Sequence, residues 1–104
     1  MRFQNGTEML EEIQSGTDLY NPRTEQYVFL YNESGSIAVY TISNGHIAKL
    51  EKLSKEYGEY WGAFLGPGGS IYDDPSYEDY EEGNYSNLDW CNDNYEGEWK
   101  DVNI

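Results

Sequence analysis

The chain has 104 residues, of which 20 are Asp or Glu and 6 are Lys or Arg, giving a net charge of −14 at pH 7. This length supports one small domain. The strong negative charge disfavours nucleic acid and anionic lipid as direct partners, because like charges repel, and favours a basic protein with fast, salt-sensitive association.

The sequence predicts no signal peptide, no membrane-spanning helix and no intramolecular disulfide bond. The first ten residues lack a basic region followed by an apolar stretch, which argues against a signal peptide. No stretch approaches the ~18 consecutive apolar residues of a membrane-spanning helix. Cys91 is the single cysteine, so no intramolecular disulfide can form. We therefore expect a reduced, cytoplasmic setting.

The first predicted helix covers residues 5–16. Asn5 or Thr7 can cap its N-terminus, and Gly16 is a suitable stop. Its apolar residues recur at helical spacing: Met9, Leu10 and Ile13. Three acids lie near its positive N-terminal end: Glu8, Glu11 and Glu12.

A β-hairpin is predicted next. Residues 17–24 contain Asn21-Pro22 and predict a loop or turn. Residues 26–31 and 36–42 are rich in β-branched and aromatic side chains, and the turn residues 32–35 separate them.

A second helix is predicted from Ser43 or Asn44 to about Tyr57, with Gly58 as its stop. Its expected buried face consists of Ile47, Leu50, Leu53 and Tyr57. His46 is expected at the surface, in the first turn of this helix.

A second hairpin is predicted from a strand at residues 59–65, a turn at 66–69 and a return strand at 70–72. The turn sequence Gly-Pro-Gly-Gly lacks the Gly-Lys-Ser/Thr ending and the following helix of a phosphate-binding loop. We therefore interpret it as a structural turn.

Two short helical segments are predicted in the last third of the chain. Residues 76–82 are expected to form a helical turn, with Pro75 at its first position. Residues 86–94 are expected to form another, with Leu88 and Cys91 facing inward.

The order of these elements predicts a single α+β domain over residues 1–104, closed by a short edge strand within 98–104. A small antiparallel sheet of two β-hairpins is expected to pack with one or two helices. The acidic C-terminal segment, residues 73–104, is expected to form short helices or irregular structure. The predicted aromatic core consists of Tyr27, Phe29, Tyr40, Trp61 and Phe64.

Residues 73–104 carry most of the charge, with eleven carboxylates and a single cation, Lys100. Disordered acidic tails are poor in aromatic residues, whereas Tyr and Trp recur throughout this segment. We therefore predict a folded negative surface. The predicted partner-binding residues are Asp73, Asp74, Tyr77, Glu78, Asp79, Tyr80, Glu81, Glu82, Tyr85, Asp89, Asp93, Glu96 and Glu98.

No catalytic, metal or cofactor site is predicted. Residues 92–97 resemble part of a calcium loop, but Asn92 takes its first position and Asn103 its twelfth, where a bidentate Glu belongs. His46 and Cys91 show neither zinc-ligand spacing nor a nucleophile signature. Paired carboxylates are so abundant that their proximity carries no information about acid/base catalysis. The chain is therefore expected not to be an enzyme.

Carboxylates fixed on a rigid surface can replace phosphates as hydrogen-bond acceptors for Arg side chains. The stretches 78–82 (EDYEE) and 95–99 (YEGEW) resemble those of small phage and mobile-element inhibitors of the anti-CRISPR or anti-restriction type, which act as DNA mimics. Residues 27–40 and 58–77 are similar to small proteins carried on Gram-positive mobile elements. The first resemblance implies an inhibitor in a bacterial host cell that binds a basic nucleic-acid-binding protein, such as a CRISPR effector nuclease or a restriction enzyme.

A second hypothesis is a non-enzymatic interaction or regulatory module of a mobile element. Such a module would bind through exposed aromatic side chains, for which Tyr77, Tyr80 and Tyr85 are the candidates. Substitution of aromatic residues, and not of acids, would then control binding, and the salt dependence would be shallow.

Overall fold

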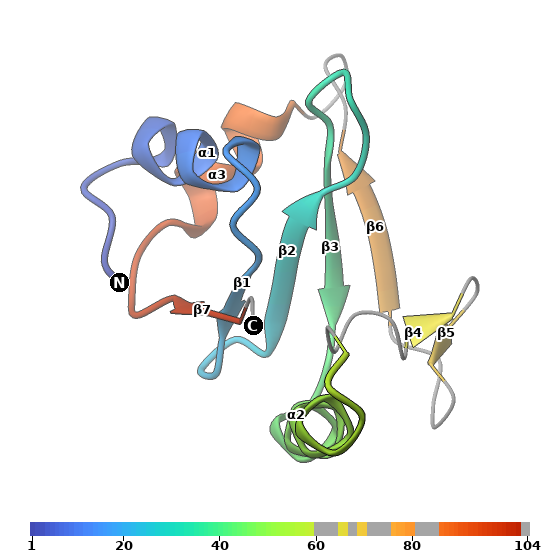
Figure 1. Cartoon of the computed structure of the whole chain (residues 1–104). Coiled ribbons are helices and arrows are strands. Elements are labelled where there is room, and N and C mark those ends of the chain that lie inside the picture. Colours follow the sequence, from blue (N-terminus) through green and yellow to red (C-terminus); the bar gives the residue numbers. More distant parts are fainter. Residues whose placement is uncertain (60–64, 67–68, 71–75, 81–85, 103–104) are drawn as a thin grey trace.

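The computed structural model describes residues 1–59, 65–66, 69–70, 76–80 and 86–102. These residues form an α+β domain with three helices, a five-stranded antiparallel sheet and a separate two-stranded sheet (Figure 1). The predicted α+β class is confirmed.

The large sheet has the strand order β6-β3-β2-β1-β7. Its strands are β1 (Leu19–Asn21), β2 (Gln26–Leu30), β3 (Ile37–Thr41), β6 (Ser76–Tyr80) and β7 (Lys100–Asp101). The predicted edge strand within residues 98–104 is therefore confirmed as β7. The small sheet pairs β4 (Leu65–Gly66) with β5 (Gly69–Ser70), as expected for the second hairpin. Glu59, the first residue of the predicted strand, is in a bend, and the rest of that prediction lies outside the described residues.

The hairpin of β2 and β3 is confirmed, and its turn is held by polar contacts. The Tyr31 N–H donates to the Ser36 carbonyl at 2.7 Å, and the Asn32 carboxamide oxygen accepts from the Ser36 N–H at 3.2 Å. Gly35 has a φ of +96°, which residues with a side chain rarely adopt.

The prediction of a loop over residues 17–24 is wrong for Leu19–Asn21, which form β1 between β2 and β7. Leu19 and Tyr20 are both buried, because neighbouring strands and helices cover both faces of β1. A strand of three residues is too short to show a two-residue period in the sequence.

The prediction of a helical turn over residues 76–82 is wrong for Ser76–Tyr80, which form the edge strand β6. β6 pairs with β3 in antiparallel register, with Tyr77 opposite Tyr40 and Glu78 opposite Val39. Pairing satisfies the backbone groups along the outer edge of β3, which outweighs a weak local helical tendency. Residues 81–82 lie outside the described part of the chain.

All three remaining helix predictions are confirmed. The helices are α1 (Gly6–Gln14), α2 (Asn44–Tyr57) and α3 (Asn87–Asn94). Their N-caps are Asn5, Ser43 and Ser86, and each cap side chain accepts a backbone N–H three residues ahead. Gly58 ends α2 in the left-handed conformation, with a φ of +68°.

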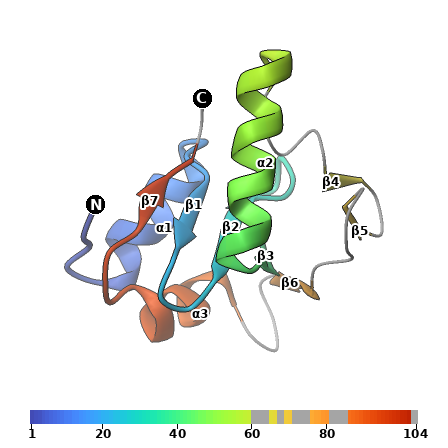
Figure 2. The same cartoon turned by 90° about the horizontal axis from the view of Figure 1, so that it is seen from below.

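The two faces of the sheet are covered by different helices. Leu19 and Val28 form a cross-strand pair that packs with α1 and α3, whereas the neighbouring pair of Tyr20 and Tyr27 packs with Ile47 of α2. Figure 2 shows α2 on one side of the sheet and α1 and α3 on the other. The core is therefore divided by the sheet into two apolar clusters.

The aromatic core prediction is confirmed for Tyr27, which is 2% exposed, whereas Phe29 and Tyr40 are half-buried. These three rings contact one another, with the centroids of Tyr27 and Phe29 5.0 Å apart. The predicted core residues Trp61 and Phe64 lie outside the described residues.

Three predicted side-chain orientations are wrong, although Cys91 is buried as expected. His46 is buried, because it precedes Leu50 by one helical turn and shares its side of α2. Tyr57 is 63% exposed, at the last residue of α2. Leu88 is 39% exposed, because the buried face of α3 is formed by Asn87, Trp90 and Cys91 instead.

The helices α1 and α3 are fixed to each other and to the hairpin. Asn87 accepts from the Ile37 N–H at 3.2 Å and donates to the Gly35 carbonyl at 3.0 Å, which attaches α3 to the β2–β3 turn. A Cβ atom built on Gly6 would lie 2.4 Å from the backbone nitrogen of Asn92. Only glycine allows α1 to approach α3 this closely.

We predict that Gly6→Ala lowers the free energy of unfolding by about 1–3 kcal/mol, because the added methyl group forces α1 away from α3. Urea denaturation measures the change. Gly45→Ala is the matched control, since nothing lies within 4 Å of its added Cβ atom. The control is expected to be neutral or stabilising. Equal stability of Gly6→Ala and the natural chain would contradict this packing.

Candidate protein-interaction surface

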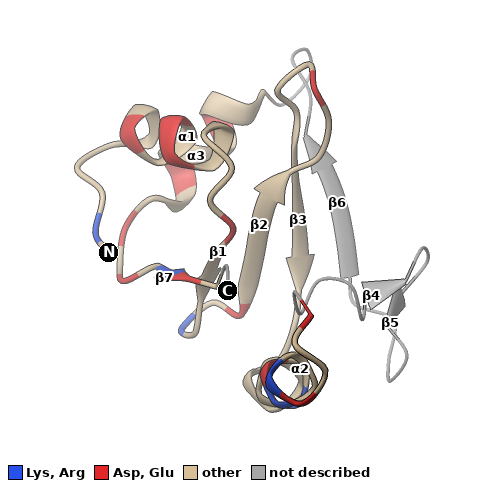
Figure 3. Ribbon diagram, in the orientation of Figure 1, with Lys and Arg blue, Asp and Glu red and all other residues tan. Residues whose placement is uncertain are grey.

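The helices α1 and α3 carry acids and no Lys or Arg. These acids are Glu8, Glu11 and Glu12 on α1, and Asp89 and Asp93 on α3. All are exposed except Glu12, which is half-buried. Figure 3 shows acids as the only charged residues on both helices. We call these five residues the acidic helical layer.

Helical spacing explains why these carboxylates share a surface. Glu8, Glu11 and Glu12 follow the i, i+3, i+4 pattern, on the side of α1 away from the buried Met9 and Ile13. Asp89 and Asp93 lie one turn apart on α3. Since α1 and α3 pack side by side, their carboxylates belong to one layer (Figures 1 and 2).

Basic residues concentrate on the other side of the sheet. Lys49, Lys52 and Lys55 are exposed on α2. Lys100 of β7 forms an ion pair with Glu51 of α2 at 2.6 Å. Lysines are thus present on α2, together with Glu51 and Glu56, and absent from α1 and α3.

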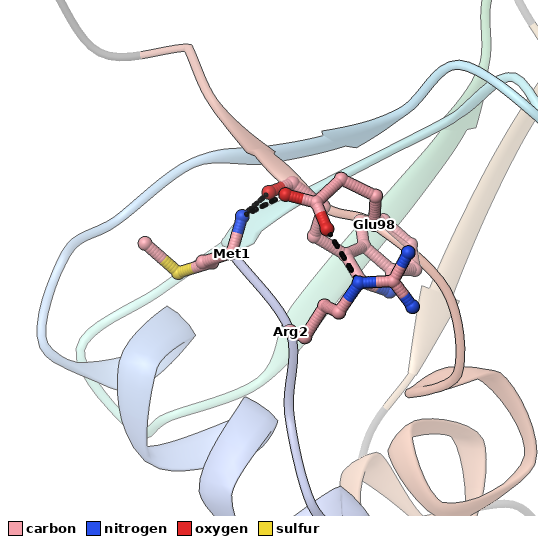
Figure 4. Close-up of polar contacts among 4 residues, drawn as sticks. Met1, Arg2 and Glu98 are labelled. Carbon is pink, nitrogen blue, oxygen red and sulfur yellow. Dashed lines mark hydrogen bonds and ion pairs between the residues drawn. The ribbon is translucent and has the colours of Figure 1, made fainter.

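Among the predicted site residues, Glu98 has its charge compensated within the molecule. Its carboxylate accepts from the Met1 ammonium group and from Arg2 Nε, both at 2.9 Å (Figure 4). The Met1 ammonium also donates to the Trp99 carbonyl at 2.6 Å. The hydrogen bond from the ammonium group is the main cause of a lowered Glu98 pKa. This carboxylate serves an internal contact before any partner binds.

Asp18 directly precedes β1, and its pKa is shifted in the opposite direction to that of Glu98. Its carboxylate accepts from the Tyr27 hydroxyl at 2.8 Å. Burial raises the pKa of Asp18, the hydrogen bond from Tyr27 lowers it, and the negative charge of Asp101 raises it further, with burial dominant. The same burial, together with the negative charge of Asp18, raises the pKa of Tyr27.

Apart from Glu98, the structure places the predicted partner-binding residues that it describes in two settings. Asp89, Asp93 and Glu96 are exposed on α3 and just after it. Tyr77, Glu78, Asp79 and Tyr80 lie in the edge strand β6, where neighbouring register positions belong to opposite faces of the sheet. The other predicted residues lie outside the described part of the chain: Asp73, Asp74, Glu81, Glu82 and Tyr85.

The acids of α1 were missed as site residues. Glu8, Glu11 and Glu12 were predicted only to lie near the positive end of their helix. Their spacing opposite Met9 and Ile13 was the available signal of an acidic helical face. The sequence did not show that α3 lies beside α1, because this contact joins segments about 80 residues apart.

The described residues contain no group of side chains arranged to bind a metal ion or to activate a nucleophile. None of their His, Cys, Asp and Glu side chains gather in threes at metal-binding distance. The calcium-like stretch 92–97 begins inside α3, which continues to Asn94, so it does not form a calcium loop. Burial raises the pKa of the Cys91 thiol to about 12, which keeps it protonated and unreactive.

Comparison of the chain with protein-family models, with curated proteins and with solved structures found no match. Of the helices in the described residues, none is long and apolar enough to cross a membrane.

We predict opposite pH effects for Asp18→Asn and Glu98→Gln. A raised folded-state pKa means that the Asp18 carboxylate costs stability above its ordinary value of 3.8, and this cost disappears below it. Asp18→Asn should therefore stabilise the domain at pH 7 and have little effect at pH 3.5.

The lowered pKa of Glu98 contributes stability above its ordinary value of 4.5, which is lost as pH falls through the folded-state value. Glu98→Gln should destabilise the domain more at pH 7 than at pH 3.5, and urea denaturation at both pH values measures each variant.

We predict that raising NaCl from 20 to 500 mM raises the melting temperature by several degrees, or about 1 kcal/mol for a domain of this size. Salt screens the repulsion among neighbouring carboxylates. Neutralising two of them, with Glu11→Gln and Asp93→Asn, should raise the melting temperature at low salt and flatten the salt dependence. Differential scanning calorimetry tests both effects, and a melting temperature independent of salt would contradict them.

Proposed function

We propose that the protein is a non-enzymatic inhibitor that binds a basic nucleic-acid-binding protein through its acidic helical layer and blocks nucleic-acid binding. The observation that carries this proposal is the pair of adjacent helices with five acids and no cation. A CRISPR effector nuclease or a restriction enzyme presents a surface of the required chemistry.

The charge density of the layer supports this proposal. Glu8 and Glu12 are four residues apart, so α1 places three carboxylates within about 6 Å of helix axis. Duplex DNA carries about one charge per 1.7 Å of axis. With the two acids of α3 beside it, the layer offers a comparable local density to a groove lined with Lys and Arg.

Rigidity is the second support. A partner surface that binds phosphates gains most from acceptors already held in place, since little entropy is then lost on binding. Capping by Asn5 and Ser86 defines where α1 and α3 begin, and Asn87 attaches α3 to the hairpin. The carboxylates therefore project from a fixed frame.

The energetic cost of the layer also favours a binding role. Like charges at i, i+4 destabilise a helix by about 0.2–0.5 kcal/mol per pair. Asp93 lies in the last turn of α3, where an acid opposes the helix macrodipole. Solubility alone would be served by acids spread evenly among cations.

The first test is to identify the partner and then measure the salt dependence of binding. Affinity capture from a bacterial lysate at 50 mM NaCl, with elution at 500 mM, supplies the partner for direct titration. The expected result is a basic nucleic-acid-binding protein whose affinity for this chain falls steeply with salt. A partner retained equally at both salt concentrations would contradict the proposal.

Charge-matched variants locate the interface. The triple variant Glu8→Gln, Glu11→Gln and Asp89→Asn removes three exposed charges of the layer. At about 0.5 kcal/mol for each exposed pair, it should weaken binding by about tenfold at 50 mM NaCl. The control Glu33→Gln, Glu56→Gln and Glu59→Gln changes the net charge equally at exposed positions elsewhere, and should bind as the natural chain does. An equal loss of affinity in both triple variants would show that binding depends on net charge and not on the acidic helical layer.

A further quadruple variant examines the predicted acidic stretch of the sequence. Glu78, Asp79, Glu81 and Glu82 are changed to Lys, and binding is measured in the same titration. A loss larger than that of the α1 and α3 triple would make the stretch that includes β6 the principal contact.

The second candidate function is an interaction module that binds through aromatic side chains. The observation that favours it is the exposure of two tyrosines, with Tyr31 at 50% and Tyr57 at 63%. Tyr31→Ala with Tyr57→Ala would then abolish binding, with a shallow salt dependence, whereas the acidic triple variant would bind normally.

A further inference from the structure

A cleft of about 470 Å³ lies where the turn between β1 and β2 meets the segment that follows α3. Its charged lining residues are Arg2, Arg23, Asp93 and Glu96. This volume is within the range of about 300–1,000 Å³ that holds small ligands. The lining combines both signs of charge in a single small space.

Two of the six cations of a chain with net charge −14 line this cleft. Arg23 forms no ion pair with any residue that the structure describes. Arg2 uses Nε to bind Glu98, and a guanidinium has five N–H donors, so further donors remain for a ligand. Guanidinium groups of this kind recognise carboxylates and phosphates.

The turn that carries Arg23 is held in one shape. The Asn21 carboxamide oxygen accepts from the backbone N–H groups of Arg23 and Thr24, at 2.9 and 3.3 Å. Glu25 closes the turn with its N–H on the Asn21 carbonyl at 2.7 Å, at the uncommon φ of +60° for a non-glycine residue. Such strained residues persist where the surroundings hold them, often beside ligand sites.

Asn21 supplies a further donor at the base of the cleft. It is 3% exposed, and its oxygen is committed to the turn, which fixes the amide plane. Its Nδ2 lies on the side of Gly97, where a Cβ atom would be 3.6 Å away, and Gly97 also lines the cleft. The described residues give Nδ2 no acceptor, so it is available to a ligand oxygen.

We propose that this cleft binds a free α-amino acid as its zwitterion. The ligand carboxylate would lie against Arg2, Arg23 and the Asn21 Nδ2. Its ammonium group would lie against Asp93 and Glu96. The side chain of the ligand would fill the remaining volume.

The net charge of the protein favours a zwitterion over other small ions. A free anion is repelled by the charge of −14 at long range, whereas a zwitterion carries no net charge. A simple cation would be attracted by Asp93 and Glu96 but would bring no counter-charge to Arg23. Only a ligand with both groups satisfies both halves of the lining.

The experiment titrates the full ¹⁵N-labelled chain with each of the twenty free L-amino acids, up to 10 mM, and follows amide chemical shifts. The expected result is saturable shifts confined to residues 2, 21–25 and 93–97 with at least one amino acid. The N-acetyl and amide derivatives of that amino acid, which each lack one charge, should bind at least about tenfold more weakly. Sodium acetate and ethylamine should cause no saturable shift.

Variants assign the two halves of the cleft. Arg23→Gln and the pair Asp93→Asn with Glu96→Gln should each weaken binding at least about tenfold, while Lys52→Gln on α2 should not. The proposal would be overturned if none of the amino acids caused saturable shifts, or if the shifts lay elsewhere in the domain. Equal affinity of the amino acid and its derivatives would also overturn it. The cleft shares Asp93 with the acidic helical layer, but failure of the two proposals is distinguishable, because the acidic triple variant spares the cleft and Arg23→Gln spares the layer.

Discussion

The contact between α1 and α3 is the constraint on which the surface chemistry of this domain depends. Both helices place apolar residues against the sheet, and Met9 and Trp90 are almost fully buried there. Burial of each large apolar side chain contributes about 1.5–3 kcal/mol. Repulsion between neighbouring carboxylates costs about 0.2–0.5 kcal/mol per pair. Packing therefore holds two acidic helices together against their charge, and Gly6 permits the close approach.

Local signals were sufficient for part of this fold. Capping residues such as Asn5 and Ser86, and the stop at Gly58, defined the helices within one or two residues. The turn residues 32–35 defined the hairpin. Each of these features is decided within a few residues of the chain, by hydrogen bonds of the backbone to a nearby side chain.

The features that sequence reasoning missed depend on distant partners. β1 is a strand because β2 and β7 pair with it on either side, and β6 is a strand because β3 offers an open edge. The rotation of α3, which exposes Leu88, follows from the hydrogen bonds of Asn87 to a hairpin about 50 residues away. The acidic helical layer was incompletely predicted for the same reason. The acids of α3 belong to residues 73–104, for which a negative surface was predicted. Glu8 and Glu11 lie beside them only because α1 packs against α3.

The unequal charge of the two helical layers has a consequence for how the molecule approaches a partner. Acids without cations occupy α1 and α3, whereas α2, on the opposite side of the sheet, carries three lysines and two glutamates. A positively charged groove therefore attracts one side of this domain more strongly than the other, over roughly the 8–10 Å of a Debye length. Such a field orients the domain before contact, which shortens the search for the bound orientation and raises the association rate. Since the sheet and its two apolar clusters keep the layers apart, the orientation is a property of the fold and does not depend on the identity of the partner.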